Sequence, residues 1–70
     1  MSRSELFKKV LKIACTRNDT PLNDDFIESV HIKRSTFYYK LKRMSFTYLE
    51  LTRIFKAANF TASEIIEVMQ

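Results

Sequence analysis

The 70-residue sequence contains no glycine, no tryptophan and only one each of proline, cysteine and histidine. With so few helix-breaking residues, the composition favours an all-α fold of short helices joined by tight connections. One cysteine cannot form an internal disulfide, and one histidine beside it leaves no recognisable set of metal ligands. No apolar run approaches the roughly 18 residues of a membrane span, and charged residues occupy the N-terminal stretch where a signal peptide has its apolar core. The sequence therefore predicts no membrane segment, no metal and no cofactor.

Positive charge is concentrated in one stretch, KRSTFYYKLKR at residues 33–43, which has five basic residues and no acid. Residues 1–32 carry five basic residues against five acids, and residues 44–70 carry two against three, so the excess is local. A concentrated basic strip is typical of proteins that bind a polyanion, because each neutralised phosphate releases condensed counterions. A solvated helix face is the alternative explanation of the same strip.

Seventy residues with 46% hydrophobic content are enough for one small domain, residues 1–70. The three-four spacing of apolar residues predicts helices at about 4–16, 21–30, 34–43, 48–58 and 62–69. The residues expected to face the core are Leu6, Phe7, Val10, Leu11, Ala14, Leu22, Phe26, Ile27, Val30, Phe37, Leu41, Met44, Leu51, Ile54, Phe55, Ala58, Ile65, Ile66 and Met69.

Capping signals mark three of these helix starts. Thr20 followed by Pro21 predicts an N-cap with proline at the first helical position. The pattern S/T-x-x-E occurs at residues 47–50 and again at 61–64, and each match predicts a capping box. Asn59, between the last two helices, is expected to end the fourth in the left-handed conformation.

The predicted third helix has two different faces. Phe37, Leu41 and Met44 recur at core-facing intervals, whereas Tyr38 and Tyr39 fall on the opposite side. Two exposed tyrosines carry much apolar surface, which a partner would cover. Packing of one ring within the domain is the alternative for either tyrosine alone.

A short helix, a three-residue turn and a second helix with a basic, aromatic outer face form the layout of a helix-turn-helix. Residues 30–42, VHIKRSTFYYKLK, resemble the LGISRSTFYRKLKG signature of small phage-type helix-turn-helix regulators, the Cro and phage-repressor DNA-binding class. Residues 46–66 are similar to the rest of that class. The chain departs from it at His31, where the family has Gly, at Ile27, where it has a small Ala, and at Lys33, where it commonly has a capping Ser.

The resemblance implies a compact, all-α, Cro/repressor-like domain of five helices, with the second and third helices forming the helix-turn-helix. It implies a sequence-specific double-stranded DNA-binding regulator, a repressor of a phage or mobile element, acting in the bacterial cytoplasm at the nucleoid. A homodimer is expected, in solution or only on DNA. The resemblance and the chemistry of the side chains assign Arg34, Ser35, Tyr38 and Tyr39 to base edges, and Lys33, Lys40, Lys42 and Arg43 to phosphates. The dimer contact is assigned to Phe60, Ile65, Val68 and Met69. For these four residues, sealing the core is the alternative role.

A different class of function uses the same fold to bind a protein, as an antirepressor or a phage inhibitor of a host or phage regulator. Enzymatic activity and a small-molecule substrate are not expected, because Cys15 and His31 have no evident catalytic partners. RNA binding would lack the sheet or loop platforms that single strands commonly use.

Overall fold

The computed structural model describes residues 2–69, which form five helices and no strand. The prediction of an all-α chain is confirmed, and the predicted bounds agree with the observed ones to within one residue at every helix except the second. The helices are α1 (Arg3–Arg17), α2 (Asp24–Ser29), α3 (Arg34–Arg43), α4 (Tyr48–Ala57) and α5 (Ala62–Met69).

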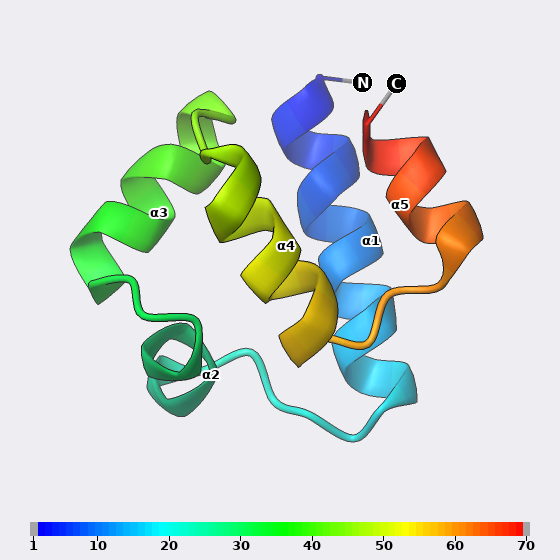
Figure 1. The fold of residues 1–70 in the computed structure, drawn as a ribbon, viewed down its shortest axis with the longest axis horizontal. Coiled ribbons are helices and arrows are strands. Elements are labelled where there is room, and N and C mark those ends of the chain that lie inside the picture. The colour runs from blue at the N-terminus through cyan, green and yellow to red at the C-terminus, as the bar shows by residue number, and fades with distance from the viewer. Residues whose placement is uncertain (1, 70) are drawn as a thin grey trace.

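The longest helix, α1, packs against two of the other helices. It contacts α3 and α5, while α2 contacts α3 (Figure 1). The start of α1 lies beside the end of α5, so these two helices run antiparallel (Figure 1). The resulting body is compact, with extents of 26 × 26 × 20 Å.

The core is built on aromatic rings and aliphatic side chains from every helix. Phe7 of α1 and Phe37 of α3 are fully buried, and both rings pack against Phe46, at centroid distances of 5.8 and 5.5 Å. The ring of Phe60 also packs against that of Phe7, at a centroid distance of 6.3 Å. Ile54 of α4 is completely buried beside them. No buried side-chain nitrogen or oxygen within residues 2–69 lacks a hydrogen-bond partner, so the interior carries no polar penalty.

The second helix is shorter than the sequence predicts. It begins at Asp24, and Asn23 rather than Thr20 caps it by accepting a backbone hydrogen bond at 3.2 Å. The N–H of Thr20 instead donates to the carbonyl of Cys15 at 2.8 Å, which closes the end of α1. The Thr20 hydroxyl also turns back toward α1 and donates to the carbonyl of Asn18 at 3.3 Å, and Asn is at least as good an N-cap as Thr. Pro21 therefore lies in the connection.

The last helix presents a different face to the core from the one predicted. Val68 is buried and Ile65 is half-buried, whereas Ile66 is 60% exposed and Met69 is also exposed. The inward placement of Ile66 and Met69 was wrong because apolar residues occur at 65, 66, 68 and 69, which fits two helical faces about 100° apart. The contact with α1 selects the face of Ile65 and Val68.

Four helices are each followed within two residues by a residue with positive φ, although the chain contains no glycine. These residues are Asp19, His31, Met44 and Asn59, with φ between 51 and 62°. Three of them are residue types enriched in the left-handed region, and Met44 is the exception. The predicted left-handed stop at Asn59 is confirmed.

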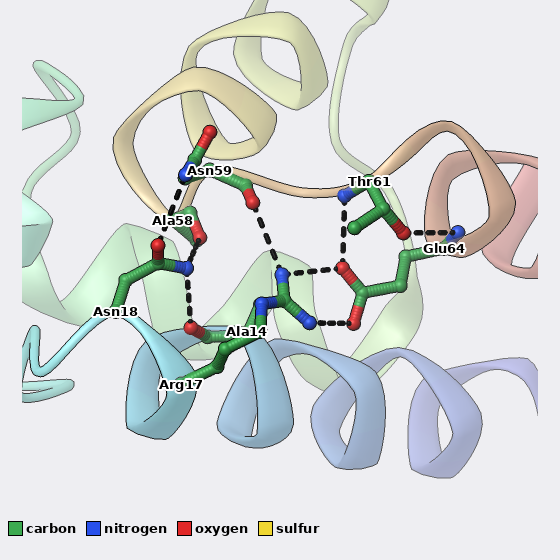
Figure 2. Close-up of polar contacts among 7 residues, drawn as sticks. All are labelled: Ala14, Arg17, Asn18, Ala58, Asn59, Thr61 and Glu64. Atoms are coloured by element: carbon green, nitrogen blue, oxygen red, sulfur yellow. Dashed lines mark hydrogen bonds and ion pairs between the residues drawn. The ribbon is translucent and has the colours of Figure 1, made fainter.

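Both predicted capping boxes are present, and each glutamate also holds a basic residue from another helix. Glu64 accepts from the N–H of Thr61 and receives a two-pronged contact from Arg17, at 2.7 and 2.8 Å (Figure 2). Arg17 donates in addition to the carbonyl of Asn59 at 3.1 Å, and Asn18 beside it receives a hydrogen bond from the Asn59 side chain. The end of α1 is thus joined to the start of α5 by charge-assisted bonds.

This junction predicts a pH-dependent stability. Hydrogen bonds from Arg17 and from the Thr61 backbone lower the pKa of Glu64 from 4.5 to about 2. A lowered pKa means that the ionised Glu64 stabilises the fold above pH 4.5, and that this contribution is lost as the pH falls toward about 2. Replacing Glu64→Gln, which keeps a capping side chain, should cost about 1 to 2 kcal/mol at neutral pH, less than the full pKa shift because solvent screens the pair.

Urea unfolding of both proteins at a series of pH values checks this. The difference between wild type and Glu64→Gln should shrink toward zero in acid. Glu67→Gln, on the exposed side of the same helix, is the matched control and should show little difference at any pH. A Glu64→Gln deficit that stays constant across the acid range would contradict the ionic origin.

Candidate nucleic-acid interface

The helix α3 is amphipathic in the way that its sequence predicts. Phe37 and Leu41 are buried against the rest of the domain, and Met44 is half-buried at its end. Lys33 is the N-cap residue, and its side chain makes no capping hydrogen bond. The connection from α2 passes through His31, whose φ of 62° is a left-handed conformation that glycine adopts more easily.

The four side chains assigned to base edges are all exposed. Arg34 and Ser35 lie in the first turn of α3, and Tyr38 and Tyr39 follow one turn later, 44% and 59% exposed. Residues spaced by three and four positions share one side of a helix, so these groups form a continuous surface. We call Arg34, Ser35, Tyr38 and Tyr39 the α3 face.

Both tyrosines are held by a neighbour, and both still present a ring surface. The Tyr38 ring meets Phe37 edge-on, with a centroid distance of 5.6 Å and an interplanar angle of 88°. The guanidinium of Arg43 lies over the Tyr39 ring, 5.3 Å from its centroid. Such a cation–π contact restrains the side chain while leaving the hydroxyl free to donate. The α3 face is therefore partly preorganised.

Three of the four residues assigned to phosphates, Lys33, Lys42 and Arg43, are exposed. The fourth, Lys40, is half-buried, and its Nζ donates to both carboxylate oxygens of Glu50 at 2.7 and 2.8 Å. Burial raises the pKa of Glu50, but hydrogen bonds from Lys40 and from the Thr47 backbone outweigh it, so the pKa lies below its usual value. Lys40 is thus already neutralised and joins α3 to α4, which makes it a weaker candidate for a phosphate than the three exposed cations.

One of the residues assigned to base edges also has an acidic neighbour. Arg34 Nε lies 3.2 Å from a carboxylate oxygen of Asp24, in the first turn of α2, and both side chains are about 70% exposed. An ion pair so open to solvent is worth about 0 to 1 kcal/mol, so it does not prevent Arg34 from turning to another partner. It does place a negative charge at the edge of the α3 face.

Replacing Asp24→Asn should therefore strengthen binding to any polyanion that meets the α3 face. Removing one exposed carboxylate and freeing Arg34 is expected to gain less than about 1 kcal/mol, at most about fivefold in affinity. Fluorescence anisotropy with random duplex DNA measures the change. Asp25→Asn removes the same charge one residue later without freeing Arg34, and an equal gain in both variants would show that the pair itself has no influence.

The residues assigned to a dimer contact are divided between core and surface. Phe60 and Val68 are buried, which favours the alternative that they seal the core rather than contact a second molecule. Ile65 is half-buried and only Met69 is well exposed. Sequence reasoning missed three other exposed apolar side chains of α4 and α5 because it placed them in the core or did not consider them; these are Tyr48, Leu49 and Ile66. Tyr48 lines a pocket together with Met69.

Residues 2–69 show no arrangement typical of a metal site, a reactive thiol or a membrane span. No group of three histidine, cysteine, aspartate or glutamate side chains there is placed to hold a metal ion. Cys15 is buried in the core, and burial raises the pKa of its thiol. No helix in this range is long and apolar enough to cross a membrane.

Comparison with known proteins returned no match of any kind: no protein-family model, no curated protein and no solved structure is significantly similar to this chain.

Proposed function

We propose that this chain binds double-stranded DNA through the α3 face and acts as a transcriptional regulator, a Cro-like repressor of a phage or mobile element. The observation that carries the proposal is the division of α3 into a buried and an exposed side. Phe37 and Leu41 are buried against the domain, and the side chains of the α3 face, Arg34, Ser35, Tyr38 and Tyr39, are exposed to solvent. Arginine can donate to both acceptors of guanine, serine can donate or accept, and a tyrosine ring can cover a thymine methyl. These are the chemistries needed to distinguish bases in the major groove.

The pairing of α2 with α3 supports a helix-turn-helix in this proposal. The two helices are in contact, and only residues 30–33 separate them. In a helix-turn-helix the second helix lies in the major groove and its N-terminal residues contact the base edges. Arg34 and Ser35 occupy that end of α3.

The proposal includes two copies on a two-fold-related site. One such helix covers few base pairs, so selectivity requires two half-sites about 34 Å apart. Met69 and Ile66 of α5, with Tyr48 and Leu49 of α4, provide exposed apolar area for the contact. Sedimentation that shows a monomer both free and on a full site would remove the dimer from the proposal.

The same exposed apolar side chains favour a second candidate function, a protein-binding antirepressor. Tyr48 is 80% exposed and Leu49 is 58% exposed, and neither belongs to the α3 face. Large exposed apolar side chains are typical of protein interfaces as well as of dimers. A gel shift on the chain's own upstream DNA, with and without a neighbouring regulator, separates the two candidates.

Selection of binding sites from random duplex DNA tests the primary proposal. We expect enrichment of a short sequence repeated with two-fold symmetry, and tighter binding to it than to scrambled duplex at the same salt concentration. Purified protein that ignores duplex DNA even in dilute buffer would contradict the proposal.

A further inference from the structure

A groove runs between α1 and α3, beside the α3 face. Three lysines of α1, namely Lys8, Lys9 and Lys12, line one side, and Tyr38 and Leu41 of α3 line the other. The hydroxyl of Ser4 donates to the carbonyl of Leu41 at 2.8 Å and so holds the start of α1 against the end of α3. The walls of the groove are therefore fixed relative to the helix that carries the α3 face.

The groove is strongly cationic. Lys8, Lys9 and Lys12 are exposed, and none of them has a carboxylate oxygen within 4.0 Å in the described part of the chain. The helix α1 as a whole has five basic residues and one acid, and of these Arg17 is the one paired with Glu64. The net charge of residues 1–32 is zero and gives no sign of this basic surface. The reason is that the other four acids of this stretch lie on α2 and in the connection to it, not on α1.

The sign of the surface charge changes across Tyr38. On one side Tyr38 and Leu22 border the lysine groove, and on the other they border a hollow lined by Asp24, Asp25 and Arg34. The first turn of α2 is thus acidic and repels phosphates, although a helix N-terminus would otherwise attract them. A phosphate backbone beside α3 is consequently directed toward α1.

We propose that the α1 lysines and Tyr38 bind the sugar-phosphate backbone of one DNA strand, adjacent to the major groove that the α3 face reads. This inference rests on the proposed function. Lys8 and Lys12 are four residues apart and rise about 6 Å along the helix. Phosphates of one strand repeat about every 3.4 Å along the duplex axis, so where α1 follows that axis the two lysines are about two phosphate intervals apart and can pair with different phosphates. The Tyr38 hydroxyl, at the border between the groove and the α3 face, can donate to a phosphate oxygen.

Continuity with the α3 face selects a duplex strand as the occupant. An acidic polypeptide would also satisfy the lysines, but a duplex presents phosphates at a regular spacing to the groove and base-edge acceptors to Arg34 and Ser35 at the same time. A backbone that follows the groove while bases meet Arg34 and Ser35 uses both surfaces together. The basic surface of the protein is then built from two helices, and Lys33, Lys42 and Arg43 form only part of it.

The test compares two double variants that lose the same charge from different surfaces. Lys8→Gln with Lys12→Gln removes two groove lysines, whereas Arg53→Gln with Lys56→Gln removes two cations that line the cleft between α2 and α4. Affinity for random duplex DNA is measured over a range of salt concentrations. We expect the slope of log affinity against log salt to fall by up to about 1.8 in the groove variant, about 0.9 for each lost phosphate contact. The cleft variant should keep the wild-type slope.

Two further variants complete the design. Lys8→Arg with Lys12→Arg retains the charge and should retain the slope. Lys9→Gln alone should lower the slope by up to about 0.9, and it serves if the double variant does not fold by circular dichroism. If the salt slope fell equally in the groove and cleft variants, the net charge of the protein would explain the fall, and the inference would be overturned.

The failures of the two proposals are distinguishable. Wild-type protein that does not bind duplex DNA overturns the proposed function and this inference together. Wild-type binding with an unchanged slope in the groove variants overturns the inference alone. Loss of binding to polyglutamate in the groove variant, with the DNA slope intact, would assign the groove to an acidic protein partner and also overturn it.

Discussion

Replacing Phe37→Ala is expected to remove most of the free energy of unfolding of this domain. Phe37 is completely buried, and its ring packs against those of Phe46 and Tyr38. Truncating a buried phenylalanine to alanine costs about 3 to 5 kcal/mol, through lost burial and the cavity left behind. A domain of this size has a total stability near the lower end of the usual range, about 5 kcal/mol, so one such loss consumes most of it. Urea unfolding followed by circular dichroism measures the loss.

Tyr39→Ala, two positions along the same helix, is the matched control. Its ring is 59% exposed and contacts the guanidinium of Arg43 rather than the core. A surface substitution of this kind changes stability by about 0.5 kcal/mol or less, whereas loss of the ring from the α3 face should weaken DNA binding. A stable Phe37→Ala protein beside an unfolded Tyr39→Ala protein would mean that α3 is turned the other way from the structure described.

Local signals in the sequence predicted most of the helix boundaries. The capping boxes at 47–50 and 61–64 locate the starts of α4 and α5 because their bonds form between residues three apart, whatever the rest of the chain does. The start of α2 could not be obtained in this way. Thr20 and Asn23 are both competent caps, and the choice between them depends on how α1 ends.

The inner face of α5 could not be predicted for a related reason. Apolar residues on both candidate faces make local periodicity ambiguous, and contact with α1, more than forty residues earlier in the chain, decides between them. Exposure of the α3 face was easier to predict, because Phe37 and Leu41 fall at an unambiguous helical spacing and no apolar residue competes on the opposite side except the two tyrosines.

Charge partners were the least predictable part of the candidate site. The capping-box glutamates, Glu50 and Glu64, each neutralise a cation from an earlier helix, Lys40 and Arg17. The partners of these ion pairs are 10 and 47 residues apart in the sequence, and no local pattern predicts a contact at such a spacing. Counting charge along the chain therefore overestimates the free charge of residues 33–43 and overlooks the lysines of α1. The phosphate-binding capacity of a small basic protein depends on which cations the fold leaves unpaired.

Replacing Arg34→Ala is expected to remove both affinity and selectivity for a preferred duplex site. Arg34 is exposed at the start of α3, where its guanidinium can donate to the two acceptors of one guanine. Loss of such a contact costs about 1 to 3 kcal/mol on the preferred site and relaxes the choice of base at that position. Titration of the variant against the selected site and a scrambled duplex, at one salt concentration, measures both effects. The loss should be several-fold larger on the selected site.

Lys42→Ala provides the contrast, because Lys42 lies later on α3 and is suited to a phosphate rather than a base. Its removal should weaken binding to every duplex alike and reduce the salt slope by about one. Lys40→Ala, by comparison, should leave the slope almost unchanged, since Glu50 already neutralises that ammonium group. If Arg34→Ala and Lys42→Ala instead lose equal affinity on selected and scrambled DNA, then the first turn of α3 does not contact bases. The protein would in that case hold the duplex by charge alone, and selectivity would have to come from another part of the molecule.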